Sequence, residues 1–125
     1  MSMTTNEQII TDFCAVWSKL DIDAIMDFFA EDGVWHNIPM AAVVGKANVR
    51  AAITGFLATS TNAEFEIHFI GSSSEGVVLT ERTDKFDLNA KQITLPVMGT
   101  FELVDGKITK WRDYFDLQTF VDQQK

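Results

Sequence analysis

The chain has 125 residues, of which 46% are apolar, and its formal net charge is -8 at pH 7. This length suits one domain with one core, residues 1–125, and the apolar content argues against a disordered chain. The negative net charge disfavours nucleic acid or an anionic membrane surface as a partner, because both bind to clusters of lysine and arginine.

The first predicted element is a helix, because apolar residues recur at helical spacing between Ile9 and Leu20. Thr5 or Asn6 is the candidate residue that caps its amino end. Cys14 is the one cysteine of the chain and falls on the apolar stripe of this helix, so we expect a buried thiol. The polar start of the chain and the lack of a long apolar run favour a cytoplasmic location without membrane contact.

Two more helices and a short strand are predicted before residue 60. A second helix is expected from Asp21 to Phe29, and Asp32-Gly33 predicts a turn after it. Val34 to Ile38 follows as a short strand that ends at a proline. Gly45 opens the third predicted helix, which places Phe56 and Leu57 on its inner side.

From residue 63 onward the apolar pattern changes to a period of two, which predicts strands. Phe65, Ile67 and Phe69 alternate with polar residues, so we expect these three side chains on one face. The remaining predicted strands are Val77 to Leu88, Ile93 to Leu103 and Lys107 to Asp116. Asp105-Gly106 predicts the hairpin turn between the last two, and the polar tail after it predicts about one helical turn.

Helices grouped before a run of strands predict an α+β fold. We expect a strongly curved, mixed but mostly antiparallel sheet, which the N-terminal helices wrap into a cone with a deep apolar pocket. A few polar groups at the bottom of such a pocket are typical of a small-molecule site. The side chains predicted to line the pocket or to position a water molecule there are Trp35, Phe56, Leu57, Phe86, Leu95, Val97, Trp111 and Phe115.

Arg82, Asp84 and Asp113 are the main candidates for chemistry. Arg82 and Asp84 are two residues apart on one predicted strand, so their side chains leave by the same apolar face. An ionised carboxylate on such a face is costly unless it is paired. One arginine between two aspartates offsets that cost and leaves a site that can hold one extra proton. The same pattern also suits a purely structural ion network, and this alternative stays open.

The three residues, with Asn37, can perform acid and base chemistry on water. Asn37 and an ionised Asp113 can hold a water molecule, and the carboxylate can take its proton as it attacks. A protonated Asp84 can give a proton to a leaving oxygen, while Arg82 contacts both acids and stabilises the charged one.

Three segments carry a resemblance to a known family. They are WHNIPM at 35–40, HFIGSSSEGVVLTERTDKFDL at 68–88 and LPVMGTFELVDGKITKWRDYFDLQTF at 95–120. These segments resemble the limonene-1,2-epoxide hydrolase family, and the similarity runs from the first helix through Phe120. The resemblance implies the cone fold of ketosteroid isomerase and nuclear transport factor, a homodimer, and no metal or cofactor.

The resemblance also implies a role for each candidate residue. Asp84 matches the general acid that protonates the epoxide oxygen, and Asp113 matches the base that activates water. Arg82 matches the arginine between them, and Asn37 matches the asparagine that positions the water. The implied reaction opens a small epoxide to a vicinal diol in one step. Trp35 departs from the family, which has a water-holding tyrosine there.

Two other function classes stay open at this stage. An isomerase or cyclase in the same cone can use an aspartate as base on a carbon acid, and a third candidate is a non-catalytic small-ligand-binding dimer module. His36 and His68 are expected on outward faces of their strands. Without acidic partners at ligand spacing, these two histidines make a poor metal site.

Overall fold

A computed structural model describes residues 2–125 of the chain. Its helices are α1 (Thr5–Val16), a 3-10 turn at Trp17–Lys19, α2 (Ile22–Met26), α3 (Lys46–Ala58) and α4 (Leu117–Asp122). Its strands are β1 (Phe29–Asn37), β2 (Val43–Val44), β3 (Ala63–Ser72), β4 (Val78–Leu88), β5 (Lys91–Val104) and β6 (Lys107–Tyr114). The predicted order of helices first and strands later is therefore confirmed.

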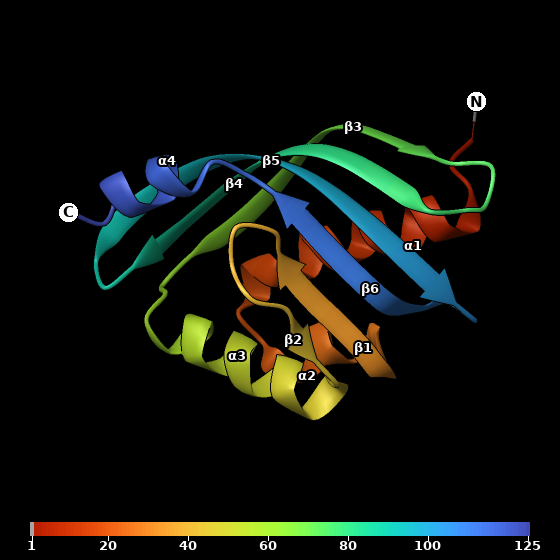
Figure 1. The fold of residues 1–125 in the computed structure, drawn as a ribbon, viewed down its shortest axis with the longest axis horizontal. Helices are drawn as coiled ribbons and strands as arrows, with labels where there is room; N and C mark the ends of the chain where they lie inside the picture. Colours follow the sequence, from red (N-terminus) through yellow and green to blue (C-terminus); the bar gives the residue numbers. More distant parts are fainter. Residues whose placement is uncertain (1) are drawn as a thin grey trace.

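The six strands form one curved sheet in the order β2-β1-β6-β5-β4-β3. Only β1 and β6 run parallel, and every other neighbouring pair is antiparallel. Helices α1, α2 and α3 lie on the concave side of the sheet, and α4 lies at the end where the chain terminates (Figure 1). This arrangement confirms the predicted mixed, mostly antiparallel sheet wrapped by helices.

The strand register brings residues that are far apart in sequence to one place. Asn37 of β1 is opposite Asp113 of β6, and Asp113 is opposite Gly99 of β5. Gly99 is in turn opposite Thr80 of β4, which lies two residues before Arg82. Because paired residues direct their side chains to the same face, this row of four strands assembles a polar cluster on the concave side.

Two predicted boundaries near the N-terminus are wrong. The cap of α1 is Thr4, one residue earlier than expected, and its hydroxyl accepts a hydrogen bond from the Glu7 N–H in a complete capping box. The second helix ends at Met26, and β1 already begins at Phe29. Gly33 belongs to β1, where the pairing with β6 slips between Phe29 and Val34. The expected turn is thus an irregularity inside one longer strand, because strand pairing overrides the local turn signal.

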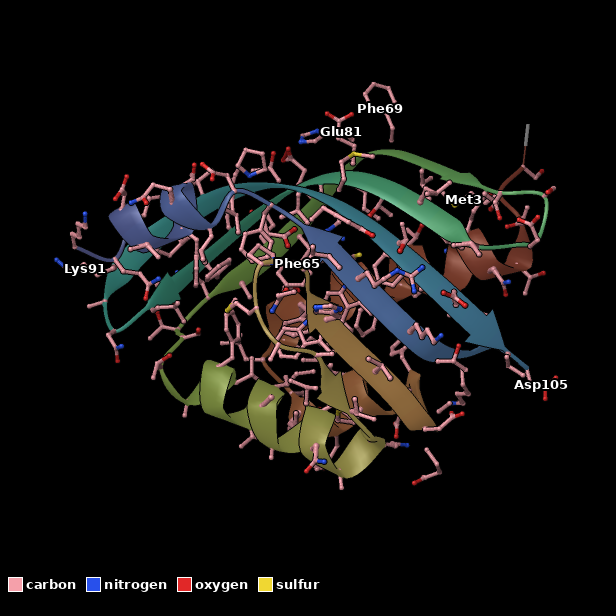
Figure 2. All side chains as sticks on the ribbon, in the orientation of Figure 1. Met3, Phe65, Phe69, Glu81, Lys91 and Asp105 are labelled. Carbon is pink, nitrogen blue, oxygen red and sulfur yellow. The ribbon has the colours of Figure 1, made fainter. Side chains whose placement is uncertain are left out.

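The prediction that Phe65, Ile67 and Phe69 share one face is also wrong for Phe69. The pairing of β3 with β4 shifts between Ile67 and Phe69, so His68 is an extra residue in β3. Phe69 is consequently 71% exposed on the convex side beside Glu81, whereas Phe65 lies inside (Figure 2). An extra residue reverses the alternation of every position that follows it.

The other differences concern the ends of elements. The last strand stops at Tyr114, two residues before the expected end, and the short strand β2 was not predicted. The sequence between Gly71 and Gly76 was expected to be a turn, but Ser72 still pairs with Val78. Hairpin residue Asp105 has a left-handed φ of 50°, as the predicted turn requires.

The hydrophobic core lies between α1, α3 and the concave face of the sheet. It is built from side chains such as Phe13, Trp17, Ile53, Phe101 and Trp111. Cys14 belongs to this core, and burial raises the pKa of its thiol to about 12, which confirms the expected buried thiol. Within residues 2–125, none of the helices combines the length and apolar content needed to cross a membrane.

Candidate active site

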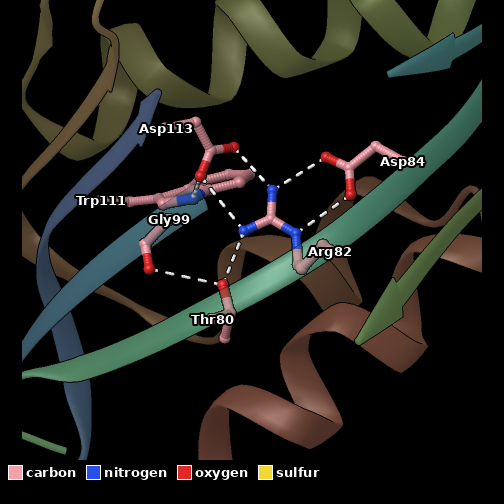
Figure 3. Close-up of polar contacts among 6 residues, drawn as sticks. All are labelled: Thr80, Arg82, Asp84, Gly99, Trp111 and Asp113. Atoms are coloured by element: carbon pink, nitrogen blue, oxygen red, sulfur yellow. Dashed lines mark hydrogen bonds and ion pairs between the residues drawn. The ribbon is translucent and has the colours of Figure 1, made fainter. Parts of the chain in front are cut away.

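Arg82 is the centre of the polar cluster (Figure 3). Its Nε and Nη2 donate to the two carboxylate oxygens of Asp84, at 3.0 and 2.8 Å. Its Nη1 and Nη2 donate to the two oxygens of Asp113, at 3.2 and 2.8 Å, and Nη1 also donates to the Thr80 hydroxyl at 3.1 Å. All five N–H groups of the guanidinium therefore have an acceptor, although the residue is only 1% exposed.

Aromatic rings enclose the guanidinium. Its central carbon lies 5.5 Å from the centroid of the Phe65 ring and 5.9 Å from that of Phe101. Such contacts favour a cation, and they help to keep the guanidinium, which is buried, away from water. The charge of Arg82 is thus held permanently between two carboxyl groups in a dry environment.

Asp84 is the acid with the altered proton affinity. Burial raises its pKa from the usual value of 3.8 to about 6, because the ionised form loses its hydration. The hydrogen bonds and charge of Arg82 act in the opposite direction, and the nearby Asp113 charge raises the pKa further. One positive charge cannot fully compensate two buried negative charges, so this pair of acids retains a proton up to about pH 6.

Asp113 is held more tightly than Asp84. In addition to the two bonds from Arg82, its Oδ1 accepts a 2.7 Å hydrogen bond from the indole N–H of Trp111. Trp111 lies two residues before Asp113 in β6, so both side chains leave by the concave face. The sequence predicts Trp111 only in the pocket wall, and the i, i+2 spacing is the signal that could have identified it as a donor to this acid.

Both acids open into a cavity of about 300 Å³. Its lining residues are Trp17, Trp35, Asn37, Met40, Phe56, Phe65, Asp84, Phe86, Leu95, Val97, Trp111, Asp113, Phe115 and Phe120. Of the side chains predicted to line the pocket, Leu57 alone is missing from this wall, and it instead packs half-buried against the core. Arg82 lies behind the acids rather than in the wall.

Four lining residues were not predicted. Phe65 belongs to β3. The alternation of this strand predicts that the Phe65 side chain points inward, but it does not predict that the side chain lies near the site. Met40 lies in the connection after β1, and Phe120 lies in α4. Trp17 lies in the 3-10 turn after α1, and its spacing predicts only a core position. Periodicity within one element shows which face is buried, but it does not show which cavity that face borders.

Asn37 and Trp35 lie on β1 at the side of the cavity next to Asp113. Trp35 is paired with Trp111 across the two strands, and their rings stack with centroids 5.4 Å apart. The indole N–H of Trp35 is buried and has no hydrogen-bond partner among residues 2–125. This wall therefore places the Asn37 amide next to Asp113 and an aromatic ring beside it.

The two histidines lie outside this cluster, as expected. The His36 ring is within hydrogen-bond distance of the Met40 carbonyl oxygen, and the His68 ring lies 2.7 Å from the Thr83 hydroxyl on the convex side. Among the described residues, 2–125, no three His, Cys, Asp or Glu side chains are grouped so that they could share a metal ion.

Gly99 is a further residue of the site that the sequence prediction missed. A Cβ at this position would collide with Arg82 Nη1 and with Asp113 Oδ1. We expect Gly99→Ala to destabilise the fold by about 1–3 kcal/mol through overpacking and to lower activity by separating the ion pairs. Chemical denaturation and kinetic measurements on the variant check both effects.

Gly71→Ala is the matched control for that change. Gly71 is also in a strand, but a methyl group added there would have no atom within 4 Å. Its substitution should leave stability and activity nearly unchanged. Equal behaviour of the two alanine variants would contradict the close packing inferred at Gly99.

Comparisons with known proteins agree with this geometry. A family model described as the limonene-1,2-epoxide hydrolase catalytic domain matches residues 4–125. Epoxide hydrolase EphG of Mycobacterium tuberculosis is 34% identical over 97 residues. The matched part covers 78% of this chain and 64% of that relative, so the chain spans less than two thirds of its length.

Solved structures give the same fold. The LEH-like epoxide hydrolase of M. tuberculosis superposes with a TM-score of 0.83 at 28% identity, covering 94% of this chain and 87% of that chain. A proposed SnoaL-like polyketide cyclase from Shewanella putrefaciens gives a TM-score of 0.85 at 15% identity, with 98% of both chains covered. The second likeness shows the fold alone, because one cone can carry different chemistries.

Proposed function

The chain belongs to the limonene-1,2-epoxide hydrolase family, and from this premise we propose that it hydrolyses a small, mostly apolar epoxide to a vicinal diol without a cofactor. The observation that carries the proposal is the sharing of one buried arginine by two carboxyl groups at the wall of an apolar cavity. This arrangement provides an acid and a base at the same time, which opening of an epoxide by water requires.

Asp113 is the proposed base. It accepts three hydrogen bonds, one more than Asp84, so its ionised form is the better stabilised of the two. It takes a proton from a water molecule as the water oxygen attacks an epoxide carbon. The C–O bond to that carbon breaks, and both electrons of the bond go to the epoxide oxygen.

Asp84 is the proposed acid. Its raised pKa of about 6 keeps a fraction of the molecules protonated at Asp84, about a tenth at pH 7, and this proton goes to the epoxide oxygen as the ring opens. After one turnover the proton is on Asp113 and the charge is on Asp84, so a proton must return to Asp84. Arg82 contacts both carboxyl groups and stabilises whichever is charged.

Asn37 and Trp35 are proposed to position the attacking water. The Asn37 amide oxygen can accept one water proton while Asp113 accepts the other. The Trp35 ring borders the cavity, but its unpaired N–H is itself enclosed by protein atoms, so Trp35 shapes the space for the water and leaves its hydrogen bonds to Asn37 and Asp113. The water-directed hydrogen bonds of the family tyrosine therefore have no counterpart in this residue.

An isomerase or cyclase of the same fold is the competing activity, favoured only by the fold of neighbours such as the Shewanella protein. Proton abstraction from a carbon acid needs one base, and a second, protonated acid can stabilise the enolate, but this chemistry has no use for an attacking water held by Asn37. A binding module has no need of either carboxyl group, because each buried charge is costly.

The decisive experiment is a single turnover of a panel of epoxides in 18O-labelled water. We expect the diol of the first turnover to carry one 18O atom, as direct attack by water demands. An unlabelled first-turnover diol would instead indicate an ester intermediate on a carboxylate. If no epoxide of the panel is hydrolysed, the proposed function is wrong.

Trp35→Tyr tests the water-holding role. We expect it to preserve or raise kcat/KM, since a phenol can both donate to the water and accept from it. Misplacement of a reacting group by about 1 Å can cost on the order of 100-fold, so the effect is measurable by steady-state kinetics. A large loss of activity would show that the indole itself is needed, for the shape of the cavity.

We also propose that the protein forms a homodimer through the convex face of the sheet. Phe69, Glu81, Met98 and Tyr114 form one row across β3, β4, β5 and β6, and the Phe69 and Met98 side chains are 71% and 51% exposed. Exposed apolar rows of this kind are typical of protein contacts. Figure 2 shows Phe69 projecting from this face.

Light scattering after size-exclusion chromatography tests the dimer. We expect Phe69→Glu to convert it to a monomer, because a carboxylate in an apolar contact is costly. Val104→Glu is the control, since Val104 is similarly exposed but lies at the far end of β5. A monomeric parent protein would contradict the proposal.

A further inference from the structure

Helix α4 supplies one side chain of the cavity wall, Phe120. The Phe120 ring contacts the rings of Phe86 and Phe115, at 6.3 and 6.0 Å between centroids. Phe86 follows Asp84 by two residues, and Phe115 follows Asp113 by two residues. Since β4 and β6 both pair antiparallel with β5, these two strands run in the same direction. Phe120 therefore covers the cavity just beyond both acids.

Few contacts hold α4 in this place. None of its residues is buried, and a helix of six residues is too short to be stable alone. Within residues 2–125, the only hydrogen bonds that join residues 116–125 to the rest of the chain are two made by the Gln123 side chain. A segment with so few ties leaves its place at a lower free-energy cost than a central strand or a long helix.

Gln123 binds to a free edge of β5. The Thr94 N–H donates to Gln123 Oε1 at 2.7 Å, and Gln123 Nε2 donates to the Thr94 carbonyl oxygen at 2.9 Å. The strand β6 pairs with β5 only from Met98 to Val104, so at Thr94 this edge has no strand beside it. The amide takes the place of a neighbouring strand, because it offers an acceptor and a donor side by side.

We propose that Gln123 is a positioning residue that keeps Phe120 in the cavity wall and thereby sets the largest epoxide that can reach the acids. This inference rests on the proposed epoxide hydrolysis. Without the bonds to Thr94, α4 is held mainly by the ring contacts of Phe120. A bulky substituent on a bound epoxide then gains room, because α4 moves away from the sheet.

A pair of epoxides of different size tests the limit. One is cyclohexene oxide, and the other carries a tert-butyl group at position 4 of the same ring. We expect the parent protein to favour the small epoxide in kcat/KM. Gln123→Ala should raise the bulky-to-small ratio about tenfold, an effect of the size expected from the loss of ordinary hydrogen bonds.

Gln124→Ala is the matched control. Both glutamines lie at the end of α4, and each donates to a helix carbonyl four residues earlier at 3.2 Å, Gln123 to Thr119 and Gln124 to Phe120. Only Gln123 also reaches β5. The control should therefore leave the bulky-to-small ratio unchanged, whereas an equal rise in both variants would overturn the role of Gln123.

A double-mutant cycle tests whether Gln123 acts through Phe120. Phe120→Ala should widen the cavity with the bonds to Thr94 intact, and it should raise the bulky-to-small ratio on its own. Adding Gln123→Ala to this variant should then have little further effect, because the side chain that it releases is already gone. Fully additive effects would contradict the proposal.

A third measurement does not depend on turnover. The ligands are the same two compounds with a cyclopropane ring in place of the epoxide, and their binding is followed by the fluorescence of the tryptophans that line the cavity, Trp17, Trp35 and Trp111. We expect the ratio of the two dissociation constants to shift about tenfold toward the bulky compound in Gln123→Ala and to stay unchanged in Gln124→Ala.

The outcomes separate the two proposals. If both epoxides are hydrolysed but Gln123→Ala changes neither ratio, the role of Gln123 is wrong and the proposed function stands. If neither epoxide is hydrolysed but the binding ratio shifts in Gln123→Ala alone, the proposed function fails while the size limit set by α4 is supported.

Discussion

Asp113→Asn is expected to lower kcat/KM by about 1,000- to 10,000-fold, the largest effect expected of any single change. The amide has the shape of the carboxyl group, but it cannot take a proton from water. The change also removes the negative charge that raises the pKa of Asp84, so Asp84 ionises more readily beside Arg82 and the acid is weakened as well. The loss is measured by steady-state kinetics with an epoxide that the parent protein hydrolyses.

Retention of the fold is essential to this interpretation. The amide oxygen in the place of Oδ1 can still accept from Arg82 Nη1 and from Trp111, so circular dichroism should resemble that of the parent. The amide nitrogen in the place of Oδ2 loses the bond from Arg82 Nη2, so thermal unfolding should show a modest loss of stability but still one cooperative transition. Asp105→Asn is the matched control, because Asp105 lies in the exposed β5–β6 turn, where asparagine tolerates the left-handed φ of 50° (Figure 2). Parent-level activity in Asp113→Asn would remove Asp113 from the role of base.

Asp84→Asn is expected to lower kcat/KM by about 100- to 10,000-fold and to change the shape of its pH dependence. Asp84 acts as an acid only when protonated, and its pKa is raised to about 6. In the parent, kcat/KM should therefore fall about tenfold per pH unit above pH 6, with about a tenth of the molecules still protonated at pH 7. The residual activity of the variant should lack this decline.

The same pKa predicts how Asp84 affects stability. Its value in the folded protein, about 6, exceeds the usual 3.8, so the folded state binds the proton more tightly than the unfolded state. The contribution of Asp84 to stability is complete below pH 4 and is lost as the pH rises to 6. Denaturation at several pH values should show a weaker decline over this range in Asp84→Asn. A decline of the same size in both proteins would assign it to other groups.

The elements of the chain were predictable where a local rule decides them. Arg82 and Asp84 face the same way because a strand alternates with a period of two, and β4 is regular throughout its pairing with β5. The same rule failed for Phe69, because the extra residue His68 reverses the alternation. A different rule failed at Asp32-Gly33, where the turn signal is overridden and the chain continues through Gly33 as part of β1.

The composition of the site was only partly predictable for a similar reason. The inward direction of Trp111 followed from its distance to Asp113 along one strand. The positions of Trp17, Met40 and Phe120 at the cavity did not, because they depend on how α1, the loop after β1 and α4 pack on the sheet. Leu57 is the opposite case: its place on the inner face of α3 predicts a position at the cavity, but the side chain packs against the core instead.

Spacing along single segments was enough to predict the class of fold, the strand that carries Arg82 with Asp84, and the chemical groups available. The folded arrangement was needed to show that Arg82 uses all five donors, that Gly99 leaves room for its contacts, and that Trp17 borders the cavity. These features arise between segments, where packing distances and the competition of every neighbour for the same space set the outcome.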